Sequence, residues 1–257
     1  MTDSETDQEL RARRAASFGG EAAAYARERP DYPDAVVRWV LEPLGARRPL
    51  RVLDLAAGTG KMTETLLRVG VPAADVVAVE PDPGMLAELR RAFPEVRALE
   101  GRAEEIPLAD GSVDAIVVGQ ALHWFDLGRA YPEMARVLAG GGVLAAVWNR
   151  DDASVPWVAG LQRVLGGGLS QRSRSGELPV SAEFPEFERA EFPHVQRRTA
   201  ESLAATIGTH SHMLVLGDAE RAEVEGRILG HLRATPETAE GEFDLPMVTL
   251  GVRARRG

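Results

Sequence analysis

Hydrophobic and polar positions follow one rhythm from residue 51 to residue 148, where short apolar runs alternate with amphipathic segments. The runs at 113–119 (VDAIVVG) and 143–148 (VLAAVW) contain almost no polar positions, which is typical of strands covered on both faces. Strands of this kind that alternate with helices predict a parallel sheet with right-handed crossovers. The pattern therefore indicates a doubly wound α/β fold.

The same rhythm gives the expected elements of the central part of the chain. We expect five strands, at 51–57, 75–80, 96–101, 113–119 and 143–148. Helices are expected at about 60–69, 83–92 and 128–138, and Gly140, Gly141 and Gly142 would form the turn that leads into the fifth strand.

The flanking segments follow other patterns. Residues 9–25 are rich in Ala, Arg and Glu, which favours a helix, and a Pro-containing stretch at 29–33 ends it. Asp34 is the predicted N-cap of a helix that carries Val36, Val37, Val40 and Leu41.

Beyond Asn149 the α/β rhythm stops. Residues 166–179 are polar and Gly-rich, and we interpret them as a mobile loop or lid. A helix is expected at 218–233, and strands at 188–195 and 243–255 would complete the sheet.

These elements predict one domain over residues 1–257. It would contain a mostly parallel, seven-stranded, Rossmann-like sheet with helical N-terminal and C-terminal cover. The cofactor-binding core would span about 35–150, and residues 1–34 and 151–257 would supply the cover and the acceptor side.

Composition narrows the choice of partners. The 257 residues include 30 Lys and Arg against 39 Asp and Glu, a net charge of -9, which repels phosphate backbones and disfavours a nucleic-acid partner. The chain has no cysteine, so thiolate metal sites and disulfides are excluded. The N-terminal 14 residues lack the apolar core of a signal peptide, and no stretch is long enough for a membrane span. We expect a soluble protein of the cytoplasm with no membrane partner and an unspecified oligomeric state.

The strongest motif is the segment 52–60, VLDLAAGTG. A strand ends in small residues, two glycines allow a sharp turn, and a helix begins at once, so backbone N–H groups and a helix N-terminus can approach a ligand. A dinucleotide site would share this pattern, but its fingerprint has a third small residue where this chain has Thr63.

Glu80 lies twenty residues beyond Gly60, where the second strand ends. A carboxylate at that position can accept hydrogen bonds from both ribose hydroxyls of an adenosine ligand. The structural alternative is that Glu80 only caps the following helix, with residues 81–83 forming a turn.

Four segments together resemble the class I S-adenosylmethionine-dependent methyltransferases. DLAAGTG (54–60) is similar to their first motif and VEPDPGML (79–86) to their second. Residues 101–126 resemble the third and fourth motifs, and RVLAGGGVLAAV (136–147) resembles the segment leading into the fifth strand. The resemblance covers about residues 18–150 and is closest to small-molecule enzymes of the ubiquinone/menaquinone-biosynthesis-like or trans-aconitate-like branch.

This resemblance implies S-adenosyl-L-methionine as cofactor, S-adenosyl-L-homocysteine as product, and a set of contact residues. Asp54 would face the amino group, Glu80 the ribose and Glu104 the adenine edge, where many relatives carry Asp at the position of Arg102. Glu104 and Glu105 could instead be a solvated helix start. The further cofactor-binding candidates are Ala56, Ala57, Gly58, Thr59, Gly60, Pro81, Asp82, Met85, Ala103, Gln120 and Ala121.

The N-terminal residues Phe18, Tyr25 and Arg29 resemble an element that folds over the cofactor in this family. Arg29 could pair with the methionine carboxylate, and an aromatic ring could face the sulfonium. An ordinary salt bridge for Arg29 and an ordinary core contact for Tyr25 are equally open.

The acceptor side should follow the fourth strand, since ligands of such sheets bind outside the carboxyl ends of the strands. Substrate-binding candidates are His123, Trp124, Phe125, Trp148 and His210, with Gln120 beside them. His123 is the catalytic candidate, because an imidazole can accept a proton near neutrality, although it could only orient the substrate. Asn149, Arg150 and Trp157 are further candidates for the pocket wall. His210 and His212 diverge on a helix and have no third ligand nearby in sequence, so we expect no metal.

The predicted function is methyl transfer to O, N or C of a small molecule, by in-line displacement. Two other functions are open: a methyltransferase fold that binds the cofactor without methyl transfer or catalyses another reaction, and an NAD-dependent oxidoreductase. The acceptor itself is not readable, and a carboxylate, a phenol or an activated carbon all suit the sequence.

Overall fold

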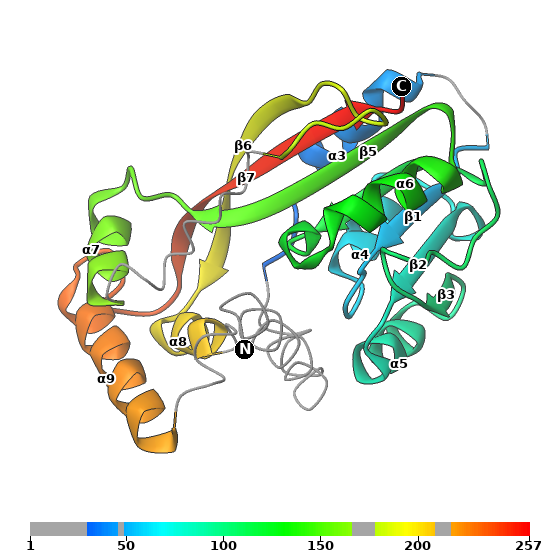
Figure 1. Ribbon diagram of the computed structural model, residues 1–257. Helices are drawn as coiled ribbons and strands as arrows, with labels where there is room; N and C mark the ends of the chain where they lie inside the picture. The colour runs from blue at the N-terminus through cyan, green and yellow to red at the C-terminus, as the bar shows by residue number, and fades with distance from the viewer. Residues whose placement is uncertain (1–29, 46–48, 166–177, 209–216) are drawn as a thin grey trace, which may run out of the picture. The chain divides into compact units, whose positions relative to one another are not determined.

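Seven segments form one sheet, in the order β3-β2-β1-β4-β5-β7-β6 (Figure 1). The structure is a computed structural model that describes residues 30–45, 49–165, 178–208 and 217–257. The predicted seven-stranded α/β sheet is confirmed. The strands are β1 Val52–Leu55, β2 Val76–Glu80, β3 Arg97–Glu100, β4 Val113–Gly119, β5 Leu138–Asp151, β6 Glu188–Arg198 and β7 Phe243–Arg255.

The five strands of the rhythmic segment are parallel to their neighbours. β1 pairs with β2 and β4, β2 with β3, and β4 with β5, all in parallel register. β7 is antiparallel to β5, because Arg256 N donates to Gly142 O while Asp152 N donates to Pro246 O. The sheet is therefore mostly parallel, as predicted.

The prediction of a turn at Gly140–Gly142 is wrong, because these residues belong to β5. Val113 pairs with Leu138 and Ala115 with Val143, so five steps along β5 match two along β4. Such an irregularity takes up extra residues without ending the strand. Gly141 has φ 68°, and a Cβ on Gly142 would lie 2.9 Å from Ala139 O. The glycines allow this local crowding rather than a reversal of the chain.

The chain forms two compact units. Unit 1 consists of residues 1–30, 150–173 and 193–248, and unit 2 of residues 31–149, 174–192 and 249–257. β5, β6 and β7 each contribute residues to both. The single methyltransferase domain over 1–257 stays a prediction.

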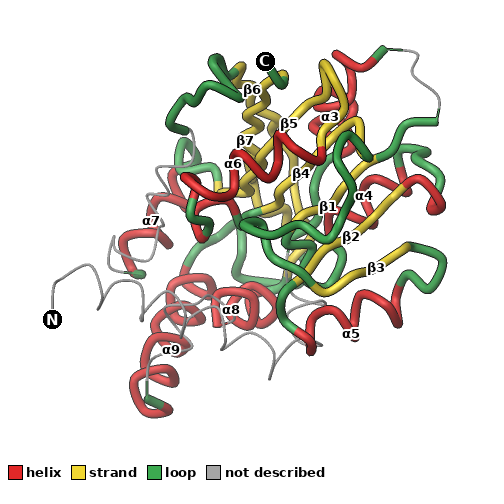
Figure 2. The backbone as a smooth tube through the Cα atoms, turned by 45° about the vertical axis from the view of Figure 1, so that its right-hand side comes forward, coloured by secondary structure: helices red, strands yellow, loops and turns green. Residues whose placement is uncertain are grey.

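Unit 2 contains α3 Asp34–Leu41, α4 Lys61–Arg68, α5 Pro83–Ala92 and α6 Leu127–Val137, besides short 3-10 turns at Glu42–Leu44 (η2), Ala73–Asp75 (η3) and Leu122–Trp124 (η4). The helices expected at 60–69, 83–92 and 128–138 are confirmed as α4, α5 and α6. In Figure 2, α5 runs alongside β3, the strand that follows it in the chain.

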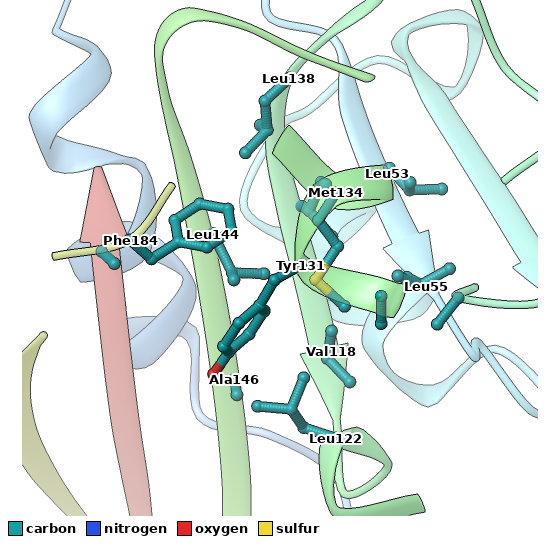
Figure 3. Packing of buried hydrophobic residues seen from close by; sticks show 14 of the residues in the cluster. Leu53, Leu55, Val118, Leu122, Tyr131, Met134, Leu138, Leu144, Ala146 and Phe184 are labelled. Atoms are coloured by element: carbon teal, nitrogen blue, oxygen red, sulfur yellow. The ribbon is translucent and has the colours of Figure 1, made fainter. Parts of the chain in front are cut away.

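Alternate residues of the central strands face two separate apolar clusters in unit 2. Leu53 and Leu55 of β1 pack with α6 residues such as Tyr131 and Met134, together with Phe184 (Figure 3). Val52 faces the other cluster, to which α3, α4 and α5 contribute. The core of unit 2 is thus a sheet buried on both faces, which explains why its strands are almost wholly apolar.

The predicted N-cap role of Asp34 is wrong. The cap position of α3 is Pro33, and no side chain caps the helix. Asp34 lies in the first turn and accepts a hydrogen bond from Arg68 Nε of α4 at 2.6 Å. The Asp34 carboxylate therefore pairs with the guanidinium of Arg68, 34 residues away in sequence, and does not cap α3.

Unit 1 contains α7 Pro156–Val164, α8 Ala200–Gly208 and α9 Asp218–Ala234. These helices share an apolar cluster with the β7 residues Phe243, Leu245 and Met247. The helix expected at 218–233 is confirmed, and α7 and α8 were not predicted. The expected helix at 9–25 and nearly all of the expected loop at 166–179 lie outside the described residues.

Candidate functional site

The turn after β1 holds three left-handed residues within five positions. Ala56 and Gly58 have φ 57° and Gly60 has φ 96°. Ala57 N donates to Val79 O of β2 and Gly60 N donates to Ala57 O, so the turn is fixed by its own backbone. A left-handed alanine is strained, and such strain persists where the surrounding structure enforces it, most often at functional sites. The sequence pattern did not predict the left-handed conformation of Ala56.

Gly60 is the N-cap residue of α4, and no side chain caps this helix. A Cβ at Gly60 would lie 2.6 Å from Phe93 Cε2, so the residue must be glycine for packing as well as for φ. The first N–H groups of α4 consequently follow a bare backbone turn, an arrangement suited to anionic or polar ligand groups.

Glu80 ends β2 beside this turn and is only 5% exposed. Its Oε2 accepts from Gly58 N at 2.8 Å and its Oε1 from Asp82 N at 2.9 Å. Burial raises the pKa of Glu80, while the two N–H groups oppose that rise. The carboxylate is therefore held in one orientation by a donor from the turn after β1 and a donor from the segment after β2.

The structure decides the alternative role of Glu80 as a helix cap. The N-cap of α5 is Asp82, whose Oδ1 accepts from Met85 N at 2.9 Å. Glu80 lies two residues earlier, at the end of β2, and does not cap α5. Of the predicted wall residues, Met85 is buried at 6% exposure, Asp82 is half-buried and Pro81 is exposed.

Asp54 lies inside unit 2 at 0% exposure. Its Oδ2 accepts from the Thr63 hydroxyl at 2.6 Å, whereas its Oδ1 is buried and has no hydrogen-bond partner among the described residues. Burial raises the pKa of Asp54 to about 7, against the opposing hydrogen bonds from Thr63. A buried carboxylate oxygen without a donor normally indicates a missing partner such as water or a ligand.

The segment that follows β3 contains Ala103, buried at 4% exposure, and Glu104. Glu104 Oε1 accepts from Asp126 N at 2.9 Å, and Arg102 Nε lies 3.8 Å from its Oε2. The alternative of a solvated helix start is wrong, because residues 102–105 form a turn closed by Glu105 N donating to Arg102 O.

Gln120 follows β4 and has φ 58°, the second left-handed residue other than glycine in the described chain. Its N–H donates to Val147 O at 2.8 Å, and its side-chain Nε2 donates to Asn149 O at 3.1 Å. Both bonds fasten the end of β4 to β5. Ala56 and Gln120 thus mark the ends of neighbouring parallel strands, where ligands of such sheets bind.

The acceptor candidates occupy the short helix η4 and its neighbourhood. His123 is exposed, and its ring centroid lies 4.7 Å from that of Trp124. Trp124 and Phe125 are half-buried, as is Ala121. Trp148 is 3% exposed and lies in the apolar cluster to which Leu53 and Met134 also belong. Its Nε1 is buried and has no partner among the described residues. Phe18, Tyr25, Arg29 and His210 lie outside the described residues.

Sequence reasoning missed two residues beside the site. Thr63 was considered only as a mismatch to a dinucleotide fingerprint, yet it is the hydroxyl donor to Asp54. Tyr32 is 5% exposed, and a Cβ on Gly119 would lie 2.7 Å from its hydroxyl. Neither contact can be predicted from the local sequence, because α4 contacts β1, and the segment before α3 contacts β4, only in the folded chain.

Two kinds of feature are absent from the described residues. No group of three or more His, Cys, Asp or Glu side chains among them is arranged to hold a metal ion. No helix in the described part of the chain is long and apolar enough to cross a membrane.

Known proteins resemble this chain over nearly all of its length. A family model described as a methyltransferase domain matches residues 53–146. An uncharacterized methyltransferase of Mycobacterium tuberculosis is 41% identical over 99% of this chain and 99% of its own length. One from Schizosaccharomyces pombe is 31% identical over 93% and 97%. The solved structure of a candidate type II methyltransferase from Anaeromyxobacter dehalogenans has a TM-score of 0.68 at 29% identity, covering 89% of this chain and 97% of that one.

Proposed function

The chain belongs to the class I S-adenosylmethionine-dependent methyltransferases, and we propose that Asp54, the turn 56–60 and Glu80 bind the cofactor for methyl transfer to a small-molecule acceptor. One observation carries this proposal: the buried carboxylate of Glu80 is oriented by two backbone donors, Gly58 N in the turn after β1 and Asp82 N just after β2. Each carboxylate oxygen has a further lone pair, and a ribose diol is the ligand group that matches two adjacent acceptors.

The residues present fit the group. The buried Asp54 Oδ1 lacks a donor among the described residues, and the methionine ammonium of the cofactor is a donor of opposite charge. At Gly58, with φ 57°, an added Cβ would meet only Met85 Sδ, at 3.8 Å. The absence of a side chain at Gly58 would let a ligand approach the backbone closely at this position.

Each remaining candidate receives a proposed role. The backbone of Ala56, Ala57, Thr59 and Gly60 would hold the methionine part, and Pro81, Asp82 and Met85 would line the adenine ring. Ala103 N–H and the Glu104 carboxylate would meet the adenine edge. Gln120 and Ala121 would complete the cofactor side at the end of β4. Phe18, Tyr25 and Arg29 keep their proposed role over the cofactor.

When bound, the cofactor supplies a methyl group on a sulfonium centre, so the leaving group is already activated and S-adenosylhomocysteine is the product. The chain's own task is to align the acceptor and to exclude water. His123 is exposed at the end of β4, where it could take a proton from an acceptor that is not yet ionised. Trp124, Phe125, Trp148 and His210 are the proposed acceptor contacts.

The acceptor is proposed as a small molecule methylated at O, N or C. The net charge of -9 supports this class over a polynucleotide. A carboxylate, a phenol and an activated carbon are the acceptor groups to screen first. The cytoplasm stays the predicted location, and the absence of nucleic-acid and membrane partners stays a prediction.

The test is a calorimetric titration of S-adenosylhomocysteine into the wild type, Glu80→Ala and the matched control Glu95→Ala. Glu95 is an exposed carboxylate between α5 and β3. Hydrogen bonds to a charged group contribute about 1.5–3 kcal/mol, so Glu80→Ala should weaken binding at least about tenfold, and the control should not. NAD should give no signal.

A wild type that binds NAD instead, or that binds no S-adenosylhomocysteine, would refute the proposed cofactor site. Binding without turnover across the acceptor screen would favour a fold that holds the cofactor without transferring its methyl group. Release of S-adenosylhomocysteine from S-adenosylmethionine, dependent on an added acceptor, establishes the transfer.

A further inference from the structure

Thr63 lies in the first turn of α4, directly after the Gly-rich turn, and is 0% exposed. The cofactor site as proposed gives it no role. Its hydroxyl donates to Asp54 Oδ2 at 2.6 Å, a short bond between two fully buried side chains nine residues apart. Hydrogen bonds to an ionised acceptor are shorter and stronger than neutral ones.

The two oxygens of Asp54 are therefore unequal. Oδ2 is occupied by Thr63, while Oδ1 is buried without a donor among the described residues. A carboxylate held by one oxygen loses its freedom to rotate, so the orientation of the second oxygen is fixed as well.

We propose that Thr63 is a positioning residue for cofactor binding. Its hydroxyl holds Asp54 Oδ2, so that the carboxylate is ionised and its Oδ1 faces the amino group of the methionine moiety. This inference rests on the proposed function. It adds a residue that acts through Asp54 and does not itself touch the ligand.

The electrostatic surroundings of Asp54 explain why the donor matters. Burial opposes ionisation and raises the pKa of Asp54 to about 7, and the nearby Glu80 carboxylate on β2 adds to that rise. From α4, the Thr63 hydroxyl lowers the pKa most, and the Thr63 backbone N–H lowers it further. Lys61, on the same helix, pairs with Asp31 at 2.8 Å and reaches Glu64 at 4.0 Å. On β4, the residue paired with Asp54 is the apolar Val117. Thr63 is thus the group that favours the charged form.

The first experiment follows the Asp54 carboxyl carbon by NMR across pH 5–9 in the ligand-free protein, for wild type, Thr63→Val, Thr63→Ser and Thr65→Val. Valine keeps the shape of threonine without the hydroxyl, and serine keeps the hydroxyl. Thr65 is the matched control, because it is also 0% exposed in α4 but donates to Lys61 O. Loss of a hydrogen bond to a charged group corresponds to a shift of at least about one pH unit.

We expect the midpoint pH of the Asp54 carboxyl titration to rise in Thr63→Val and to stay near the wild-type value in Thr63→Ser and Thr65→Val. An unchanged midpoint in Thr63→Val overturns the inference. This measurement needs no ligand, so it stands apart from the proposed function.

The second experiment measures S-adenosylhomocysteine affinity at pH 6.0, 7.0 and 8.5 for the same four proteins, with thermal unfolding recorded at each pH. Thr63→Val should bind about tenfold more weakly at pH 7.0 and recover as the pH is raised, while Thr63→Ser should bind like the wild type. A loss that is equal at all three pH values, or that Thr65→Val shares, would make Thr63 merely structural and overturn the proposal. Failure of the wild type to bind at any pH refutes the proposed function, and with it this use of Asp54.

Discussion

Replacing Gly60 with alanine should destabilise unit 2 strongly, for two reasons that the structure separates. The first is conformational, since Gly60 has φ 96°, which L-residues with a side chain rarely adopt. The second is steric, because the new Cβ would lie 2.6 Å from Phe93 Cε2 and 3.4 Å from Leu89 Cγ. Leu89 is fully buried and Phe93 packs against the same cluster, so neither can move without disturbing the core.

The magnitude follows from these two contributions. A left-handed conformation costs an alanine about 1–2 kcal/mol, and forcing extra atoms into a well-packed core costs about 1–3 kcal/mol. Gly60→Ala should therefore lower the free energy of unfolding by about 2–5 kcal/mol. Because Gly60 lies at the start of α4 and is a proposed cofactor contact, the same change should also weaken S-adenosylhomocysteine binding.

Gly70 provides a matched control at the other end of α4. It has the same φ of 96°, but a Cβ there would meet nothing within 4 Å. Gly70→Ala should thus show the conformational contribution alone, about 1–2 kcal/mol. The assay is urea unfolding followed by tryptophan fluorescence, in which the buried Trp148 reports on unit 2.

The steric contribution is then isolated by a double-mutant cycle. In a Phe93→Ala background, Gly60→Ala should cost no more than Gly70→Ala does, because the clashing ring is gone. The reasoning is refuted if Gly60→Ala and Gly70→Ala destabilise equally in the presence of Phe93, or if removal of the ring leaves their difference unchanged.

Two further predictions concern the neighbouring carboxylates. Burial raises the pKa of Asp54 from 3.8 to about 7, so between these two values the native state binds more protons than the unfolded state. The contribution of Asp54 to stability is therefore lost as the pH rises from about 4 to 7. Asp54→Asn should be more stable than wild type to urea at pH 8, and equal or lower stability there would contradict the burial argument. Asp82 caps α5 by accepting a hydrogen bond from Met85 N. Asp82→Ala should therefore lower the free energy of unfolding by about 1 kcal/mol, whereas Asp82→Asn should keep most of the wild-type stability because Asn also caps helices. If Asp82→Asn is as unstable as Asp82→Ala in urea unfolding, the cap is not the source of the lost stability.

Local sequence patterns predicted the rhythmic part of the fold closely. Apolar runs fix strand positions because each such run must be buried on both faces, and Gly, Pro and small residues mark the turns between them. The strands β1 to β4 and the helices α4 to α6 fall within two residues of their predicted ends. The sequence also predicted that the Gly-containing turn follows β1 and that Glu80 ends β2, and both are observed.

Features that depend on a distant partner were missed or misread. Gly140–Gly142 look like a turn in sequence, and only pairing with β4 makes them an irregular part of β5. Asp34 has the spacing of an N-cap, but Arg68 takes its carboxylate. The helices α7 and α8 were not predicted, and they are stabilised by contacts with α9 and β7.

The sequence by itself thus determined the fold class, the end of the sheet at which we propose that the cofactor binds, and the carboxylates available there, because these depend on short-range periodicity and chain order. Only the tertiary structure decided what each carboxylate does. Glu80 is oriented by two backbone N–H groups, Asp82 caps α5, and Asp54 is half-satisfied by Thr63. Hydrogen-bond partners and burial set the charge and direction of a side chain, and both arise from segments that meet only when the chain is folded.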